Sequence, residues 1–242
     1  MLTARNISKS IQGKSILQNV SLQIQPNEIT VLLGPSGAGK TSLLRALALI
    51  DLPDKGEVAV DEKTYSFPQA DAHLQNPPWP KLTVVFQQLF LWPHLTLREN
   101  ILLPARNLKN PHLERDFNEL VRALHMKSFI DSYPNEASVG QRQRVALARA
   151  ILLEPRYILM DEITSALDIE QIHEIIQFLP RLKAKGVGIL IITHLLNFAR
   201  RTADHILFLD HGRIVEEGNA GILSKPNTER FAKFLSVVEA AS

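Results

Sequence analysis

The chain has 242 residues, of which 45% are apolar and 21% are charged, so it can bury the core of one large domain and is not globally disordered. Its formal net charge is only +2 and its basic residues form no stripe, so we predict no nucleic-acid partner; with no cysteine, disulfides and thiol chemistry are excluded. The opening residues lack the apolar segment of a signal peptide and no stretch reaches about 18 uncharged apolar residues, so a membrane role would require a partner.

The first 87 residues predict strands with one helix among them. The segment 20–25, VSLQIQ, alternates apolar and polar residues, as a half-buried strand does. The segment 28–33, EITVLL, is almost entirely apolar and predicts a strand covered on both faces. Residues 41–50 then change to helical spacing. Further along come a hairpin at 56–67, a loop rich in proline at 66–80 and a strand at 81–87.

From about residue 88 to 150 the pattern is helical, and strands return after it. We predict strands at 157–162 and 187–194, a helix at 168–186 between them, a hairpin at 205–218 and a C-terminal helix that buries Phe231, Phe234, Leu235 and Val238. Strands that alternate with helices predict a largely parallel sheet, and the helical stretch predicts a lobe inserted into it.

The segment GPSGAGKT at 34–41 matches the pattern G-x-x-x-x-G-K-[ST], between a buried strand and a helix. Its glycines let consecutive N–H groups converge on an anion, and the helix that follows adds its free N–H groups. Lys40 supplies a charge for the β- and γ-phosphates, and the Thr41 hydroxyl can bind Mg²⁺. Since a chance match in a loop of this length is rare, we predict a nucleoside triphosphate site. Its predicted contacts are Gly34, Pro35, Ser36, Gly37, Ala38, Gly39, Lys40, Thr41 and Ser42.

Two carboxylates, Asp161 and Glu162, close the strand at 157–162. Ligands of parallel sheets lie beyond the carboxyl ends of the strands, so both acids should reach the edge where the 34–41 loop lies. We predict that Asp161 holds Mg²⁺ and that Glu162 acts as general base on a water molecule. His194 ends the strand at 187–194 and should lie on the same edge. The plainer alternatives are a helix cap for Asp161 and an ordinary strand-end histidine.

The ordered segments GPSGAGKT, VVFQQ, SVGQRQR, ILMDE, SALD and ITH resemble the ATP-binding subunits of ABC transporters, over nearly the whole chain. The resemblance implies an α/β fold. It has a P-loop NTPase core with a mainly parallel sheet, an antiparallel β subdomain and an inserted helical subdomain. We predict one nucleotide-binding domain over 1–242, with a core of about 1–87 and 151–242 and a helical subdomain of about 88–150. ATP and Mg²⁺ are the implied ligands.

The resemblance also assigns roles to residues outside the 34–42 segment. It implies that Gln87 touches Mg²⁺ and senses the membrane subunit, and that His194 contacts the γ-phosphate. The turn at 137–141, with Ser138, Gly140 and Gln141, would face the γ-phosphate bound by a second subunit in a head-to-tail dimer. Asp168 would end the SALD loop that crosses between subunits, and Ile11 would cover the adenine. We interpret Arg142, Arg144 and Arg149 as a solvated helix face.

Within the family, the segments FQQLFLWPHLTLRENI, THLLNFARR and GRIVEEG look most like importers of polar amino acids, although Leu195 stands where these often have Glu. The implied function is ATP hydrolysis that energises uptake of a polar amino acid. The implied partners are a second copy or a homologous ATPase subunit, integral membrane permease subunits and a solute-binding protein. The implied location is peripheral, at the cytoplasmic face of the inner membrane. The alternatives are a nucleotide-gated clamp without transport and a weakly hydrolysing regulatory module.

Ile11 occupies the place where the family has an aromatic residue against adenine. An aliphatic side chain covers the base but loses stacking, which is worth about 1 kcal/mol by analogy with other base–aromatic contacts. We therefore expect turnover of ATP and GTP at comparable rates, measured as phosphate release with each nucleotide. A strong preference for ATP would contradict this expectation.

Val139 stands where the signature turn of the family has Gly. A β-branched residue restricts the backbone and fills space close to the partner's phosphates. We expect Val139→Gly to speed dimer closure and raise ATPase activity in the assembled transporter. Unchanged activity of that variant would show that the valine is neutral.

Overall fold

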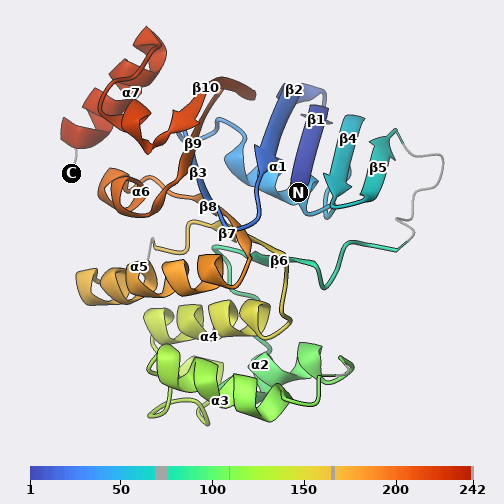
Figure 1. Ribbon diagram of the computed structural model, residues 1–242, viewed down its shortest axis with the longest axis vertical. Helices are drawn as coiled ribbons and strands as arrows, with labels where there is room; N and C mark the ends of the chain where they lie inside the picture. The colour runs from blue at the N-terminus through green and yellow to red at the C-terminus, as the bar shows by residue number, and fades with distance from the viewer. Residues whose placement is uncertain (69–75, 109, 165–166, 241–242) are drawn as a thin grey trace.

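Two β-sheets and a set of helices make up the structure (Figure 1). The computed structural model describes residues 1–68, 76–108, 110–164 and 167–240. The first sheet has four antiparallel strands in the order β2-β1-β4-β5. They are β1 (Leu2–Ile11), β2 (Lys14–Ile24), β4 (Lys55–Val60) and β5 (Lys63–Phe67). The predicted hairpin at 56–67 is therefore confirmed, while the predicted loop at 66–80 begins two residues later than expected and lies partly outside the described residues.

The second sheet has six strands in the order β10-β9-β3-β8-β7-β6. They are β3 (Ile29–Leu33), β6 (Leu82–Val85), β7 (Tyr157–Asp161), β8 (Gly188–Ile192), β9 (His205–Asp210) and β10 (Arg213–Asn219). Pairing is parallel from β9 to β6, and β10 runs antiparallel beside β9. Every residue of β3, β7 and β8 is buried, as expected for parallel strands covered on both faces. The predicted mainly parallel sheet is confirmed.

The helices form two groups in Figure 1. The first group lies against the sheets: α1 (Lys40–Leu47), α5 (Ile169–Ala184), α6 (Leu196–Thr202) and α7 (Glu229–Ala240). The second group lies beyond α5: α2 (Leu97–Leu102), α3 (Leu113–Ala123) and α4 (Val139–Ile151). Short 3₁₀ helices span Leu103–Ala105, Pro134–Glu136 and Ala220–Leu223. In the described ranges, no helix has both the length and the apolar character needed to cross a membrane.

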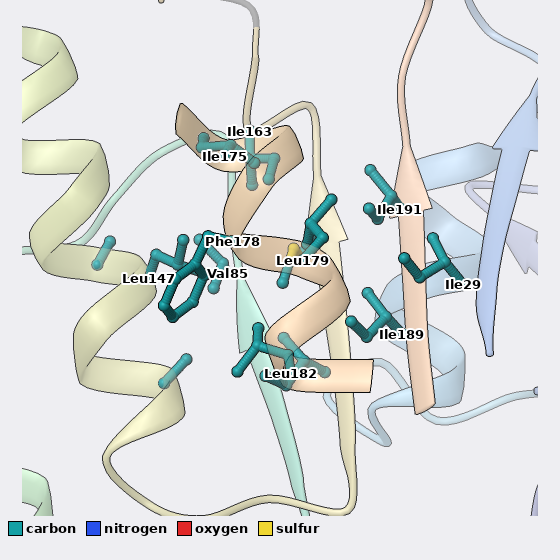
Figure 2. Close-up of a cluster of buried hydrophobic side chains, with 14 of the residues drawn as sticks. Ile29, Val85, Leu147, Ile163, Ile175, Phe178, Leu179, Leu182, Ile189 and Ile191 are labelled. Carbon is teal, nitrogen blue, oxygen red and sulfur yellow. The ribbon is translucent and has the colours of Figure 1, made fainter. Parts of the chain in front are cut away.

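One continuous apolar core joins α4, α5 and the parallel sheet, and α4 packs directly against β6. Phe178 of α5 lies close to Leu147 of α4 and to Val85 of β6, and Leu179 and Leu182 extend from the same helix into the core (Figure 2). The second group of helices is therefore bound to the sheet by side-chain packing as well as by the chain. The predicted boundaries of a helical subdomain stay a prediction.

The observed elements differ from the predicted ones mainly at their ends. β2 begins at Lys14 rather than at residue 20, because its first half pairs with β1 although its residues do not alternate cleanly. The helix predicted at 41–50 ends at Leu47, and Leu49 takes a positive φ of 57°. Helix α6 was not predicted, since seven residues are too few for its periodicity to stand out.

The C-terminal helix α7 is held to the sheet by stacked rings and by two buried carboxylates. The rings of Phe231 and Phe208 stack with centroids 4.6 Å apart. Asp210 accepts from Arg230 Nε at 2.7 Å, and this ion pair holds the pKa of Asp210 below its usual range. Glu216, at 7% exposure, accepts hydrogen bonds from the backbone and side chains of residues 227–228 at 2.6–3.1 Å. Burial raises the pKa of Glu216, but these donors outweigh it and lower the pKa overall.

We expect Glu216→Gln to lower the free energy of unfolding at pH 7 by about 2 kcal/mol, because an amide nitrogen would face donors that now share a buried carboxylate. Since the folded-state pKa is lowered, the stabilisation is complete above the unfolded value of about 4.3 and is lost as the pH falls through the folded value. Urea unfolding at pH 7 and pH 4 would measure both effects. The exposed neighbour Glu217 gives the matched control, and a loss in Glu217→Gln equal to that in Glu216→Gln would contradict the assignment.

Candidate nucleotide site

Four neighbouring parallel strands end at one edge of the sheet, and a predicted site segment follows each of them. The segments are the loop 34–41 after β3, His194 after β8, Glu162 after β7 and Gln87 after β6. Ile192 of β8 pairs with both Leu32 of β3 and Asp161 of β7, so these strands end at the same level. The sheet therefore brings the predicted loop, acids and histidine to a common edge.

The loop after β3 forms an open cradle in front of α1. Gly39 is the N-cap of α1 with a φ of 102°, and no side chain caps the helix. Its first-turn N–H groups therefore remain available to an anion. A Cβ at Gly39 would lie 3.0 Å from the Ile16 carbonyl oxygen of β2, whereas a Cβ at Gly37 would meet nothing within 4 Å. Strand β2 therefore packs against the cradle at Gly39, whereas the cradle is open at Gly37.

Lys40 lies across the cradle and is close to both acids. Its Nζ donates to the carbonyl oxygens of Gly34 and Pro35 at 2.8 and 2.9 Å. Burial lowers the pKa of Lys40, and the charges of Glu162 and Asp161 partly restore it. The ammonium group therefore lies between the loop carbonyls and the two carboxylates.

Asp161 is almost completely buried, at 3% exposure, at the end of β7. Burial raises its pKa, the Thr41 hydroxyl that donates to it acts in the opposite direction, and the Glu162 charge raises it further. The pair Thr41 and Asp161 therefore offers a hydroxyl and a carboxylate side by side in a place that favours a cation.

These residues fit Mg²⁺ and a triphosphate. Mg²⁺ prefers oxygen ligands and usually takes only one or two from protein, with water and phosphate completing its shell. Thr41 and Asp161 supply that number, and the described residues contain no cluster of three or more His, Cys, Asp or Glu that would suit a softer or fully protein-bound metal. The uncapped helix and the open glycine loop suit the phosphates.

The backbone of Glu162 is held by the neighbouring strand. Its N–H donates to the Ile192 carbonyl oxygen at 3.0 Å, and its φ is +48°, a region that a residue with a side chain rarely occupies. Two residues on, the buried hydroxyls of Thr164 and Thr193 lie 3.3 Å apart. Thr193 Oγ1 also accepts from the N–H of Leu195 at 3.1 Å, so the threonine pair joins the segments that carry Glu162 and His194. The sequence reading missed both threonines, although each stands beside a predicted site residue.

The predicted signature residues form the first turn of α4. Ser138 is the N-cap, and it and Gln141 exchange backbone and side-chain hydrogen bonds at 2.8 and 3.2 Å. A Cβ at Gly140 would lie 2.1 Å from the side-chain oxygen of Gln171, so a larger residue there would require the flexible end of Gln171 to move. Val139 is 45% exposed. Among the described residues, no hydrogen bond or ion pair joins this turn to the cradle at 34–42.

The remaining predicted residues lie on the surface. Ile11 is 45% exposed at the end of β1, in the hairpin whose other strand supports Gly39. Gln87 and His194 are also exposed. Asp168 caps α5 by accepting from the Gln171 N–H at 2.8 Å, while Ser165 and Ala166 of the same predicted loop lie outside the described residues.

The interpretation of the α4 arginines as a solvated face is wrong for two of them. Arg144 donates to the Leu124 carbonyl oxygen and pairs with Glu174, both at 3.3 Å. Arg149 donates to the carbonyl oxygens of Leu89 and Phe90 at 2.7 and 2.9 Å. Both arginines thus hold backbone or side chains of other segments, which the charge pattern alone does not reveal.

The model of the family described as ABC transporter matches residues 17–165. The chain belongs to the ABC transporter family. The glutamine transport ATP-binding protein GlnQ of Escherichia coli is 37% identical over 98% of this ABC chain and 100% of its own length. The L-cystine import ATP-binding protein TcyC of Bacillus subtilis is 36% identical over 98% of both chains. The arginine transport ATP-binding protein ArtP of Escherichia coli is 38% identical over 91% of this chain and 93% of its own.

Solved ABC cassettes show the same fold. A dimeric structure of a cassette in a post-hydrolysis state, bound to ADP and Pi, superposes with a TM-score of 0.78 at 31% identity, over 91% of this chain and 99% of the other. A dimeric bacterial ABC transporter cassette gives 0.79 at 30% identity over the same shares. The predicted family, fold and ATPase activity of this ABC chain are confirmed.

Proposed function

We propose that this chain is the ATP-hydrolysing subunit of a transporter that takes up a polar amino acid. The observation that carries the proposal is the meeting of the glycine loop, Lys40 and the acid pair at the end of neighbouring parallel strands. The glutamine, cystine and arginine transport proteins that it resembles over nearly their whole length supply the solute class.

In this proposal, residues 34–42 bind the phosphates of ATP. The free N–H groups of the loop and of α1 surround the phosphates, and the Lys40 ammonium exchanges its loop carbonyls for the β- and γ-phosphate oxygens. Thr41 and Asp161 hold Mg²⁺, with Gln87 as a further ligand. When bound, the metal ion neutralises charge that develops on the phosphates. Ile11 covers the adenine.

Glu162 acts as general base in the same proposal. It lies half-buried next to Asp161, on a backbone held by β8, and accepts a proton from the water that attacks the γ-phosphate. The exposed His194, connected to this segment through the two threonines, contacts the γ-phosphate. Most of the catalysis is then positioning and charge stabilisation, as in other phosphoryl transfers.

The signature turn completes the site of a second subunit. Ser138 and the N–H groups at the start of α4 form an anion-binding helix end that the cradle of the same chain does not use. We therefore propose a head-to-tail dimer, with a second copy or a homologous ATPase subunit, in which this turn meets the γ-phosphate held by the partner. Dimeric cassettes of similar fold support the arrangement.

An apolar groove between β6 and α4 is the proposed docking place of the permease. The groove has a volume of about 390 Å³ and is lined by the residues just after α1, by β6 and by α4. Ile50, Trp79 and Trp92 on its walls are 48%, 50% and 38% exposed, which is unusual for side chains so large and apolar. Arg149 on its floor holds the segment just after Gln87, so a helix of the permease seated there would press on the Gln87 loop.

Two parts of the proposal rest on the family alone. A solute-binding protein would deliver the amino acid to the permease, and the chain would lie at the cytoplasmic face of the inner membrane as a peripheral subunit. Tagging the chain in its host, co-purifying its membrane subunits and measuring ATPase stimulation by individual polar amino acids would test the proposed transport function. Lack of stimulation by any polar amino acid would count against that solute class.

We expect Glu162→Gln to lower phosphate release by at least about 100-fold while nucleotide stays bound, because the amide keeps the shape of the side chain but cannot accept the proton. Phosphate release and retained ATP would be measured on the same purified complex. Glu170→Gln, at an exposed position in the first turn of α5, is the control and should behave as wild type. Phosphate release by Glu162→Gln at the wild-type rate would rule out Glu162 as the base.

A further inference from the structure

A buried glutamine connects α4 to the segment that carries Glu162. Gln143 is 4% exposed, and its Nε2 donates to the backbone carbonyl oxygen of Ile163. Its Oε1 is also buried and has no hydrogen-bond partner among the described residues. A buried amide whose nitrogen is hydrogen-bonded but whose oxygen is not adds little net stability. We therefore look for a role of Gln143 other than stabilising the fold.

Ile163 is the residue directly after Glu162, so a bond to the Ile163 carbonyl restrains the backbone next to Glu162. The core holds the same segment through the Glu162 N–H on β8 and through Thr164 on Thr193. Gln143 adds an anchor from α4, a helix that also packs against β6. The segment therefore depends on two bodies, the sheet and α4, for its position.

The other end of this connection is the signature turn. Ser138 caps α4 only five residues before Gln143, about 7.5 Å along one helix, so the two move together. The apolar packing of α4 in the core that it shares with β6 and α5 (Figure 2) is non-directional and tolerates small shifts. A hydrogen bond is directional, so a shift of α4 is felt at the Ile163 carbonyl.

We propose that Gln143 is a positioning residue that transmits the position of the signature turn to Glu162. This inference rests on the proposed function, in which Ser138 meets the phosphate held by the partner and Glu162 acts on the ATP of its own chain. Nucleotide binding at one composite site then positions, through α4, the general base of the other site. The two sites of the dimer are coupled by a side chain that touches neither nucleotide.

The main test is Gln143→Met, which keeps the length of the side chain and removes its donor. In the transporter complex we expect kcat to fall about ten-fold while the KM for ATP stays within about two-fold, because binding residues are untouched. The melting temperature should change little, because loss of the unpartnered oxygen offsets loss of the hydrogen bond to the Ile163 carbonyl. Gln143→His restores a ring N–H of similar reach and should recover most of the activity. A wild-type kcat for Gln143→Met, or a histidine variant as slow as the methionine variant, would overturn the inference.

A double-mutant cycle separates transmission from local damage. If the signal from Ser138 passes through Gln143, adding Gln143→Met to Ser138→Ala should slow turnover by less than about three-fold further, rather than by another ten-fold. Leu147→Ala, a buried change on the same helix, should lower the melting temperature and leave kcat unchanged. Full additivity in the cycle, or a kcat in Leu147→Ala as low as in Gln143→Met, would refute transmission.

The failures are distinguishable. A wild-type complex that releases no phosphate would sink the proposed function, whereas an active complex that is indifferent to Gln143 would sink this inference alone.

Discussion

The in-register parallel pairing of β3, β8, β7 and β6 is the constraint on which the rest of the structure depends. Parallel strands that end at one level bring the segments after them to a common edge, and here those segments are the glycine loop, His194, the acid pair and Gln87. The strands are buried along their whole length, so apolar packing and not the polar site fixes their position. The chemistry is therefore assembled by residues that take no part in it.

Charge in the cradle is balanced within a small volume. Lys40 is partly buried between two loop carbonyls and two carboxylates. Asp161 lies beside the Thr41 hydroxyl and is affected by the charge of Glu162. Burial alone would drive each group toward its neutral form, and the opposite charges oppose that tendency. A magnesium ion would add positive charge beside the two carboxylates, and a triphosphate would add negative charge beside Lys40. This is why the site suits that ligand pair better than a metal alone.

Helix α4 contacts or carries several segments that the proposed mechanism uses. Its N-terminus is the Ser138 turn proposed to meet the partner's phosphate, its middle reaches the backbone beside Glu162 through Gln143, and its C-terminal part holds the carbonyls after Gln87 through Arg149. The helix is otherwise joined to the sheet by apolar packing in the core that it shares with β6 and α5 (Figure 2). A rigid helix with a directional bond at each of two points suits the transfer of small movements between distant segments. The apolar groove proposed to receive the permease, with its exposed tryptophans, is lined in part by the same helix.

The sequence by itself determined the alternation of strands and helices, the cradle at 34–41 and the acids after β7, because apolar periodicity and local motif spacing are properties of neighbouring residues. It missed α6, the early start of β2, the threonine pair and the roles of Gln143 and Arg149. Gln143 and Ile163 are 20 residues apart, and Arg149 and Leu89 are 60 apart. Such contacts depend on how α4 packs against the rest of the chain, and no local pattern encodes that distance. Only the tertiary structure decided which polar side chains on α4 face water and which hydrogen-bond to the backbone beside the predicted catalytic residues.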